Sequence, residues 1–367
     1  MIPIRVLQIL PAINFCGGIE NYVMNYYRNI NREKIQFDFI THTDLESSFK
    51  DEILSLGGKI YEFPVFKISN VRQILKKIDE FFKENKDVYK TIHCHMANAA
   101  YFYFKTAKKY GIKSCILHSH QNKGSDKLFN NLRNIPLLFF ANNFATERVA
   151  CSELAGKFLF KKKSFKIIRN AIDVNRFKFN KFVREKIRKE LNIENKFVVG
   201  HVGRYTPQKN QSFLIRIFNE LIKKERNNVL ILIGSGEDES KLKILVNKLN
   251  LQEKVIFLPT QKNIADYYNA FDVFVLPSLY EGLPVSGVEA QANGLFCLFS
   301  DTISKEVLIC NSKQLSLNSS PDIWSDNILE KIKFFERKDC SENIHKFGYD
   351  INYEAKNLED FYLSLYE

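Results

Sequence analysis

The sequence contains no run of apolar residues long enough to cross a membrane. Spanning a bilayer as a helix takes about 20 consecutive apolar residues, and no segment of the 367-residue chain reaches that length. The first apolar run, IRVLQIL, is short and ends at Pro11, so we expect a strand there rather than the longer helical core of a signal peptide. A cytoplasmic protein is therefore expected.

Paired cysteines are also missing. The seven cysteines lie at positions 16, 94, 115, 151, 297, 310 and 340, without any C-x-x-C spacing. A scattered, odd-numbered set is typical of reduced thiols in a cytosolic protein and argues against a disulfide framework. We therefore expect free thiols.

Acidic residues are few in the first half of the chain, which is therefore strongly basic. Residues 1–178 carry 29 Lys or Arg against 16 Asp or Glu, whereas the remainder carries 25 against 26. Nucleic acid, an anionic membrane surface or an acidic substrate would each be attracted to such a half. The segment GKFLFKKKSFKIIRN (156–170) mixes lysines with bulky apolar residues, which suits anionic lipid, although it could also be a solvated face. No nucleic-acid-binding motif accompanies the charge, so nucleic acid is the least favoured partner.

Strand-like and helix-like segments alternate in two series, from IRVLQIL to SCILHSH (4–120) and from KFVVGHVGR to DVFVLPS (196–278). Repeated strand–helix units predict a parallel sheet covered on both faces, and right-handed crossovers make it doubly wound. The expected fold class is α/β, with two Rossmann-like domains facing across a cleft. We assign these domains to residues 1–178 and 196–344, with a polar, basic linker at 179–195.

The most informative segment is LPSLYEGLPVSGVEAQANG (276–294), which ends a strand and starts a helix. Pro284 fits the first helical turn, where proline has no N–H to lose, and Gly294 fits the helix end. Unpaired N–H groups and the positive dipole end predict a phosphate site at this helix start. Glu281 precedes the helix and Glu289 lies in its second turn, so their carboxylates can accept hydrogen bonds from ribose and sugar hydroxyls.

A second cluster, VGHVGRYTPQKNQ, follows the first strand of the second series. Gly203 would let the backbone approach a ligand. Arg204 and Lys209 would place two cations opposite the helix start, as a diphosphate leaving group requires. Gly234 and Gly236 in IGSGE follow the next strand, where they would either allow a nucleotide to approach or serve an ordinary turn.

Glycines and histidines mark strand ends in the first series. Gly17 and Gly18 lack a complete G-x-G-x-x-G pattern, but would let the backbone pass close to phosphates. HCH (93–95) and HSH (118–120) each place two histidines on one face of a strand. Acidic or thiolate ligands at a convincing spacing are missing, so we expect cleft-lining histidines rather than a zinc site.

With GGIE, GR…KN, VLPSLYEGLPVSGVEA and SDT in this order, the chain resembles family 4 glycosyltransferases, which are retaining enzymes with the GT-B fold. The likeness runs to about residue 310 and is greatest to bacterial members that build capsular or exopolysaccharide repeat units. It implies that the second domain binds a nucleotide sugar, expected to be a UDP-sugar, and that the first binds a lipid-linked saccharide acceptor. It also implies that a last helix, about 345–367, packs back on the first domain.

The resemblance assigns roles to single residues. Arg204 and Lys209 would hold the donor diphosphate, Glu289 the ribose and Glu281 the donor sugar. His118 matches the active-site histidine of the family, with His120 left open by one possible shift of register. The common E-G-F-G pattern is replaced at Leu283 and Pro284, which removes one N–H from the phosphate turn. The expected donor-binding residues are Gly18, Arg204, Lys209, Gly234, Gly236, Glu281, Gly282, Leu283, Pro284, Val285 and Glu289.

The implied reaction is transfer with retention, without a divalent metal or another cofactor, because cations and helix N–H groups stabilise the departing diphosphate. Its catalytic residues would be His118, Glu281, Arg204 and Lys209. A nucleotide-sugar epimerase and an inverting transferase remain alternatives on the same fold. Since lipid-linked acceptors lie in the inner leaflet, the basic first domain is expected to bind the inner face of the cytoplasmic membrane peripherally.

Overall fold

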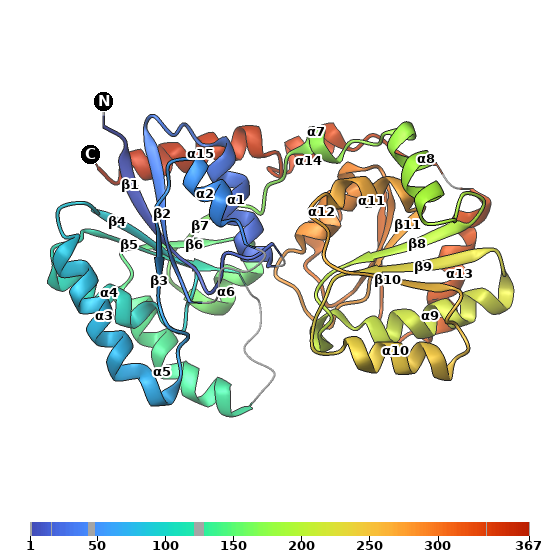
Figure 1. Ribbon diagram of the computed structural model, residues 1–367, viewed down its shortest axis with the longest axis horizontal. Coiled ribbons are helices and arrows are strands. Elements are labelled where there is room, and N and C mark those ends of the chain that lie inside the picture. The colour runs from blue at the N-terminus through green and yellow to red at the C-terminus, as the bar shows by residue number, and fades with distance from the viewer. Residues whose placement is uncertain (1, 16, 43–47, 121–127, 335, 367) are drawn as a thin grey trace. The chain divides into compact units, whose positions relative to one another are not determined.

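The chain folds into two compact units, as the computed structural model in Figure 1 shows. Unit 1 joins residues 1–171 to residues 351–367, and unit 2 comprises residues 172–350. Cys16 lies outside the described residues. The structure describes residues 2–15, 17–42, 48–120, 128–334 and 336–366.

Unit 1 is built on a seven-stranded parallel sheet with the strand order β3-β2-β1-β4-β5-β6-β7. The order reverses at β1, which pairs with β2 on one side and β4 on the other. Ligands of doubly wound sheets collect at such a switch point. The strands are β1 (Ile4–Ile9), β2 (Ile35–Thr41), β3 (Ile60–Glu62), β4 (Thr91–Cys94), β5 (Ser114–Ser119), β6 (Glu147–Ala150) and β7 (Lys166–Ile167).

Helices cover both faces of this sheet, so neighbouring side chains of a strand enter different cores. Val6 of β1 packs in one core, with residues of the first and last helices, and Leu7 packs in the other. This two-sided burial explains the nearly continuous apolar runs of the strands. The helices of unit 1 are α1 (Gly18–Asn29), α2 (Lys50–Ser55), η1 (Ile68–Asn70), α3 (Val71–Glu84), α4 (Ala100–Lys109), α5 (Leu128–Phe144), α6 (Glu153–Phe160) and α15 (Ile351–Ser364).

Unit 2 contains a six-stranded parallel sheet with the order β10-β9-β8-β11-β12-β13, in which the switch point lies between β8 and β11. Its strands are β8 (Phe197–Val202), β9 (Asn228–Ile233), β10 (Val255–Leu258), β11 (Val273–Leu276), β12 (Phe296–Ser300) and β13 (Ser312–Leu315). Its helices are α7 (Val174–Phe177), α8 (Lys181–Glu190), η2 (Pro207–Lys209), α9 (Gln211–Lys224), α10 (Glu239–Lys248), α11 (Ile264–Ala270), α12 (Val285–Ala292), η3 (Lys305–Val307), α13 (Pro321–Lys333) and α14 (Ser341–Lys346).

The boundary between the units differs from the expected linker at 179–195, which belongs to unit 2. Helix α8 occupies this segment, and its Arg184 and Arg188 both pair with the buried carboxylate of Asp272. Arg184 Nη1 also donates to the carbonyl of Phe271 at 2.9 Å. A polar, basic sequence suggested a solvated connection, but buried ion pairs fasten this segment to the second sheet.

The chain returns to unit 1 at its last helix. α15 begins at Ile351, whereas residues expected to start it form α14 in unit 2. Its buried face includes Ala355, Leu358 and Tyr362, which share a core with side chains of α1. The two ends of the described chain therefore lie in the same unit.

The expectation of free thiols throughout is wrong for one pair. Cys310 and Cys340, 30 residues apart, form a disulfide with Cα atoms 5.8 Å apart. It ties the segment before β13 to the start of α14, a proximity that arises only in the folded unit. The free cysteines of the described residues, Cys94, Cys115, Cys151 and Cys297, are buried.

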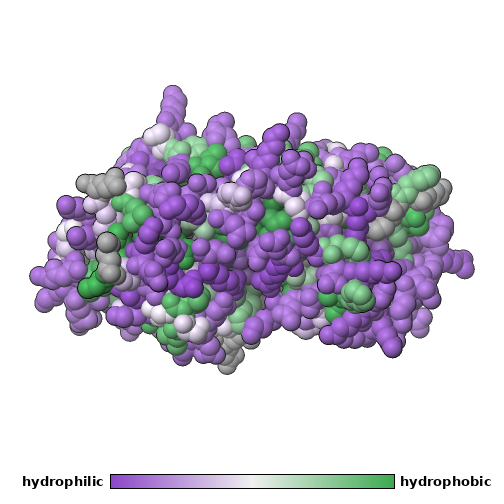
Figure 2. All heavy atoms as spheres, turned by 90° about the horizontal axis from the view of Figure 1, so that it is seen from above, coloured by the Kyte–Doolittle hydropathy of each residue, from purple (hydrophilic) through white to green (hydrophobic). Residues whose placement is uncertain are grey.

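Apolar side chains are concentrated in the interior of the units. The face shown in Figure 2 is mostly hydrophilic, with hydrophobic residues in small separate patches. Among the described residues, none of the helices combines the length and apolar character needed to span a bilayer.

Candidate functional site

The predicted donor-site residues of unit 2 come from the loops and helix starts that follow β8, β9 and β11. All three strands are parallel, so their carboxyl ends meet at one edge of the sheet, beside the switch point between β8 and β11. The fold thus brings together residues that lie up to 85 positions apart, from Arg204 to Glu289. Gly18 and His118, also predicted, lie in unit 1.

The centre of this edge is an ion pair between Lys209 and Glu281. Lys209 Nζ lies 2.6 Å from Glu281 Oε1, and the two side chains are only 17% and 10% exposed. The loops that carry them are joined directly: Leu279 N donates to the Gln208 carbonyl at 2.8 Å, and Gln208 Nε2 donates to the Tyr280 carbonyl at 3.1 Å. The pair is therefore held in place by backbone contacts as well as by charge.

The SDT segment (300–302) holds the loop after β11 in place by hydrogen bonds. The hydroxyls of Ser300 and Thr302 donate to the carbonyl of Ser278, at 2.5 and 2.8 Å. Glu281 also forms a short parallel bridge with Ile303. These contacts fix the path of the chain into α12, and with it the position of the Glu281 carboxylate.

Arg204 combines a fixed backbone with an exposed side chain. Its carbonyl accepts a hydrogen bond from Gln211 Nε2 at 2.8 Å, and the same amide lies 3.2 Å from His201 Nε2. His201 Nδ1 donates to the carbonyl of Val275 at 2.9 Å. Burial lowers the pKa of His201 to about 4, so the ring is neutral and its Nε2 accepts from Gln211. No local sequence pattern indicates these contacts of His201 and Gln211.

Helix α12 begins one residue later than predicted. Pro284 is its N-cap and Val285 its first residue, while the Gly287 N–H already bonds the Pro284 carbonyl. The N–H groups of Val285 and Ser286 precede the first carbonyls they could reach within the helix. The start of α12 therefore keeps two donors for an anion, and proline's missing N–H costs none of them.

Gly294 ends α12 as predicted, with φ of +80°. A Cβ there would lie 2.5 Å from the Lys338 carbonyl oxygen, so glycine is required by both conformation and space.

Glu289 is held by a buried tyrosine. Tyr268 Oη donates to Glu289 Oε2 at 2.8 Å, from α11 to α12. Burial raises the pKa of Glu289, and the hydrogen bond from Tyr268 opposes that rise. One carboxylate oxygen is thus oriented by Tyr268, which the sequence analysis did not identify.

The glycines after β8 and β9 serve loop packing. A Cβ on Gly234 would lie 2.1 Å from the Gly203 carbonyl oxygen, and one on Gly236 would lie 2.3 Å from the Tyr205 carbonyl oxygen. Their presence is explained by the contact between the two loops, without a nucleotide. Gly282 and the buried Leu283 lie between Glu281 and α12.

The two glycines of GGIE differ in the space that is available for a side chain. A Cβ on Gly17 would lie 1.7 Å from Glu20 Oε2, whereas a Cβ on Gly18 would have no atom within 4 Å. At Gly17 a Cβ would require the end of the Glu20 side chain to move, whereas the space beside Gly18 is open.

The four histidines of HCH and HSH gather at the ends of β4 and β5. His93, His95 and His118 are at most 5% exposed, and only His120 keeps a larger exposed part. The rings of His118 and His120 stack with centroids 4.0 Å apart, and those of His93 and His95 with centroids 4.4 Å apart. The expectation that these histidines line a cleft is therefore wrong for the three buried ones.

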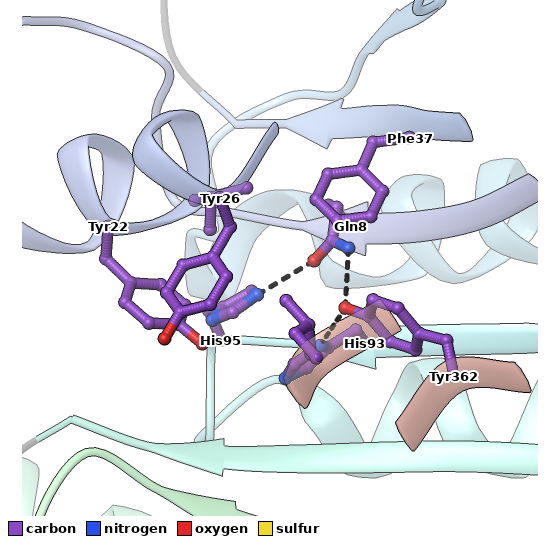
Figure 3. A pocket seen from close by; sticks show the side chains of 9 residues that line it. Gln8, Tyr22, Tyr26, Phe37, His93, His95 and Tyr362 are labelled. Carbon is purple, nitrogen blue, oxygen red and sulfur yellow. Dashed lines mark hydrogen bonds between the residues drawn. The ribbon is translucent and has the colours of Figure 1, made fainter. Parts of the chain in front are cut away.

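These rings are joined by hydrogen bonds. His93 Nε2 lies 3.0 Å from His118 Nδ1, and His95 Nδ1 lies 2.8 Å from His120 Nε2. Burial lowers the pKa of His93 and of His120 to about 3, and it lowers those of His95 and His118 well below their usual range. All four imidazoles are consequently neutral at pH 7. Figure 3 shows Gln8 and Tyr362 bonded to this group.

A metal could be considered at this place, because ligand atoms of His93, His95 and His118 lie within 4.8 Å of one another. Except for the buried His118 Nε2, their nitrogens are already paired with one another and with His120, Tyr362 and Gln8. The packed side chains shown in Figure 3 leave no room for a bound molecule among them. The arrangement is that of a hydrogen-bonded interior network.

Comparisons with known proteins cover both units. The chain is 32% identical over 374 residues to the putative glycosyltransferase EpsF of Bacillus subtilis (strain 168), covering 98% of this chain and 96% of that protein. It is 25% identical to the Escherichia coli UDP-Gal:alpha-D-GlcNAc-diphosphoundecaprenol alpha-1,3-galactosyltransferase, covering 99% and 97%.

The fold is shared with solved structures. The crystal structure of Anabaena Alr3699/HepE in complex with UDP-glucose superposes with a TM-score of 0.83 at 19% identity, covering 98% of this chain and 99% of that one. The two doubly wound parallel sheets are those of the GT-B fold. The sequence model of the family described as glycosyl transferases group 1 matches residues 183–349, which include the whole donor-site edge of unit 2. With these matches, the chain belongs to the group 1 glycosyltransferases.

Proposed function

We propose that this protein transfers a sugar from a UDP-sugar to a lipid-linked saccharide acceptor, with retention of anomeric configuration and without a divalent metal, as a family 4 enzyme of bacterial cell-surface polysaccharide synthesis. The observation that carries this proposal is the Lys209–Glu281 ion pair beside the start of α12. It places a cation, a carboxylate and free helix N–H groups at one sheet edge, where a sugar diphosphate needs all three.

The donor diphosphate would bind between the start of α12 and the cations. Lys209 would exchange Glu281 for a phosphate oxygen, and the exposed Arg204 would close on the same group. The exchange frees Glu281 to accept a hydrogen bond from a hydroxyl of the donor sugar. Glu289, oriented by Tyr268, would accept from the ribose with its second oxygen.

In the reaction, the bond between the anomeric carbon and the diphosphate oxygen breaks while the acceptor oxygen bonds to that carbon from the same face. The proton of the acceptor hydroxyl passes to the departing diphosphate. Negative charge grows on the diphosphate, where Arg204, Lys209 and the helix N–H groups are already placed. His118 or His120 of unit 1 would bond a sugar hydroxyl.

Two relatives support the substrate classes. UDP-glucose is the ligand in the Anabaena structure, and the Escherichia coli relative carries UDP-Gal and a diphosphoundecaprenol-linked sugar in its name.

Membrane binding by unit 1 fits the acceptor class. Helix α5 exposes Ile135, Phe139 and Phe140, which are 61%, 62% and 44% exposed, and α6 exposes Leu154 and Phe158. Lys157 and the lysines at 161 and 162 are exposed at the end of α6. Leu159 and Phe160 are buried in the core, so the segment 156–170 cannot lie flat on lipid as a whole. The proposed contact is made by these exposed apolar side chains, with the lysines facing anionic headgroups.

The test is a thermal-shift screen with UDP, GDP, ADP and CMP, each with magnesium and with a chelator, followed by transfer assays with the stabilising UDP-sugar. Stabilisation by UDP alone, unchanged by the chelator, together with an α-linked product from an α-linked donor, is the expected result. Stabilisation that needs magnesium would contradict metal independence. Interconversion of nucleotide sugars without any acceptor would replace transfer by epimerisation.

A further inference from the structure

The two hydrogen-bonded branches of the histidine network in unit 1 meet at one group, the hydroxyl of Tyr362 in helix α15. Tyr362 is fully buried, and its Oη lies 3.0 Å from Gln8 Nε2 and 2.7 Å from His93 Nδ1. Gln8 belongs to the central strand β1, 354 positions earlier in the sequence. Figure 3 shows Tyr362 Oη bonded to both neighbours, and Gln8 bonded onward to His95.

The orientation of the Gln8 amide fixes the protonation of the next two rings. Its Nε2 faces Tyr362, so its Oε1 faces His95 and can only accept. His95 therefore carries its proton on Nε2 and donates it to Gln8 at 3.0 Å. The bare Nδ1 of neutral His95 must then accept from His120 Nε2 at 2.8 Å. It follows that His120 carries its proton on Nε2 and keeps the lone pair of Nδ1.

The second branch agrees with this direction. Since Tyr362 Oη accepts from Gln8, it donates its own proton to His93 Nδ1, and His93 donates from Nε2 to His118 Nδ1. Reversing this branch would leave the Tyr362 hydroxyl proton and the buried His118 Nε2 lone pair without partners, instead of a single unpaired group. His118 is almost fully buried and stacks on His120, whereas His120 keeps an exposed part.

If the network served packing alone, it would fill this space at a higher desolvation free energy than aliphatic side chains would. Four neutral imidazoles, an amide and a tyrosine hydroxyl must all be desolvated, where aliphatic side chains would pack without that cost. The partly exposed ring of the network is His120, which the sequence analysis kept as the alternative to His118.

We propose that Tyr362, acting through Gln8 and His95, is a positioning residue that holds His120 in the Nε2–H tautomer, so that His120 Nδ1 accepts a hydrogen bond from a saccharide hydroxyl during transfer. The proposal rests on the proposed glycosyltransferase function and selects His120, rather than His118, as the ring that meets the substrate. It also makes the C-terminal helix part of the active-site machinery.

The tautomer is measured directly by long-range ¹H–¹⁵N NMR of the full-length, ¹⁵N-histidine-labelled protein. Wild-type His120 should show a protonated Nε2 and an unprotonated Nδ1. In Tyr362→Phe, the Gln8 amide loses its anchor and the His120 signals should move toward a mixture of tautomers. Tyr26→Phe is the matched control, because that buried hydroxyl donates to the Arg169 carbonyl instead. The proposal is overturned if the signals of His120 are the same in wild type and Tyr362→Phe.

Kinetics test the substrate contact. We expect Tyr362→Phe to lower kcat roughly 10- to 100-fold with little change in the KM for the donor, since misplacing a positioned group acts mainly on the reacting complex. Tyr26→Phe should stay within about twofold of wild type, the scale of a remote change. Wild-type kcat in Tyr362→Phe would contradict the role.

Two substitutions of His120 identify the atom that meets the substrate. The amide of His120→Asn can place an oxygen near the Nδ1 position, whereas that of His120→Gln reaches the Nε2 position, so His120→Asn should retain more activity. The opposite order would overturn the assignment of Nδ1. If wild-type protein shows the predicted tautomer and its dependence on Tyr362 but transfers no sugar, the proposed function fails and the tautomer control stands.

Discussion

The two units present polar groups in opposite ways. In unit 2, Lys209 and Glu281 form an ion pair at the carboxyl ends of the strands, with side chains that are 17% and 10% exposed. In unit 1, four histidines are held neutral, with three of them buried, and are ordered by hydrogen bonds from Tyr362 and Gln8. A diphosphate requires charge, whereas a sugar hydroxyl requires a correctly oriented lone pair. On the proposed function, the difference follows the chemistry of the donor diphosphate and of the saccharide hydroxyl.

Removing the cation should have the largest effect. Lys209→Met deletes the charge that meets the leaving diphosphate, and we expect kcat/KM to fall by about 100-fold or more. Arg204→Ala should cause a loss of similar order with little change in Tm, because its side chain is exposed. Lys241→Met is the control, since that lysine is 76% exposed and pairs only with Asp238 among the described contacts. Transfer rates within threefold of wild type for Lys209→Met would remove the assignment.

Loss of the ribose contact should have an intermediate effect. Glu289→Gln keeps the shape of the side chain but removes the charge, and we expect kcat/KM with the UDP-sugar to fall about 10- to 100-fold, the range of a lost charged hydrogen bond. Tyr268→Phe should cost less, because Glu289 remains and loses only its orientation. Comparing UDP with 2′-deoxy-UDP checks the contact: equal discrimination by wild type and Glu289→Gln would show that Glu289 does not bind ribose.

The neutral histidines predict loss of stability in acid. Burial holds the folded-state pKa of each ring below the ordinary histidine value of 6.5, and it lowers the pKa of His93 and of His120 to about 3. The unfolded chain therefore binds protons that the folded chain excludes, so the stability is complete above pH 6.5 and declines as the pH falls toward 3. Each histidine that is protonated in the unfolded chain and neutral in the folded chain adds about 1.4 kcal/mol per pH unit to the slope of the unfolding free energy.

Denaturant unfolding between pH 7 and pH 4 measures that slope. His93→Asn should reduce the slope, whereas Tyr26→Phe, which removes a buried hydroxyl but no imidazole, should leave it unchanged. A slope unaffected by His93→Asn would mean that the buried ring is not the group that resists protonation.

The smallest effect is expected for membrane binding. Phe139→Glu places a charge at an exposed apolar position of α5 in unit 1, and flotation with anionic vesicles should show binding reduced a few-fold, as expected when one aromatic side chain is lost from an interfacial contact. Phe182→Glu on α8 of unit 2 is the matched control, because Phe182 is 83% exposed. Equal losses in the two variants would remove the distinction between the units.

The sequence predicted the strand and helix of segment 273–294 well because its signals are local. Strand, proline, helix and terminal glycine follow one another from 273 to 294, and the structure reproduces them with a shift of one residue at Pro284. The supports of these residues are side-chain contacts that local patterns do not reveal: Tyr268 reaches Glu289 from another helix, and Gln211, which also contacts His201, donates to the Arg204 carbonyl.

Unit 1 was less predictable for the same reason. Gln8 stands out as the one amide in the apolar strand IRVLQIL, and this was the available signal of a buried polar network. Its partner Tyr362 lies in a helix at the other end of the chain. Likewise, α8 appeared to be a linker because the Asp272 carboxylate that binds it is distant in sequence. Periodicity identifies elements, but it does not identify their long-range partners.

The return of α15 to unit 1 has a consequence for biosynthesis. Unit 2 is continuous between residues 172 and 350, so all of its strands are available before the chain is finished. The core of unit 1 is completed only when α15 has been synthesised. Until then, the faces of α1 and β1 that pack against α15 stay uncovered. At a synthesis rate of 5–20 residues per second, the 354 residues between Gln8 and Tyr362 correspond to a delay of roughly 20–70 s. During that interval the nascent first unit exposes an apolar surface that only α15 can cover.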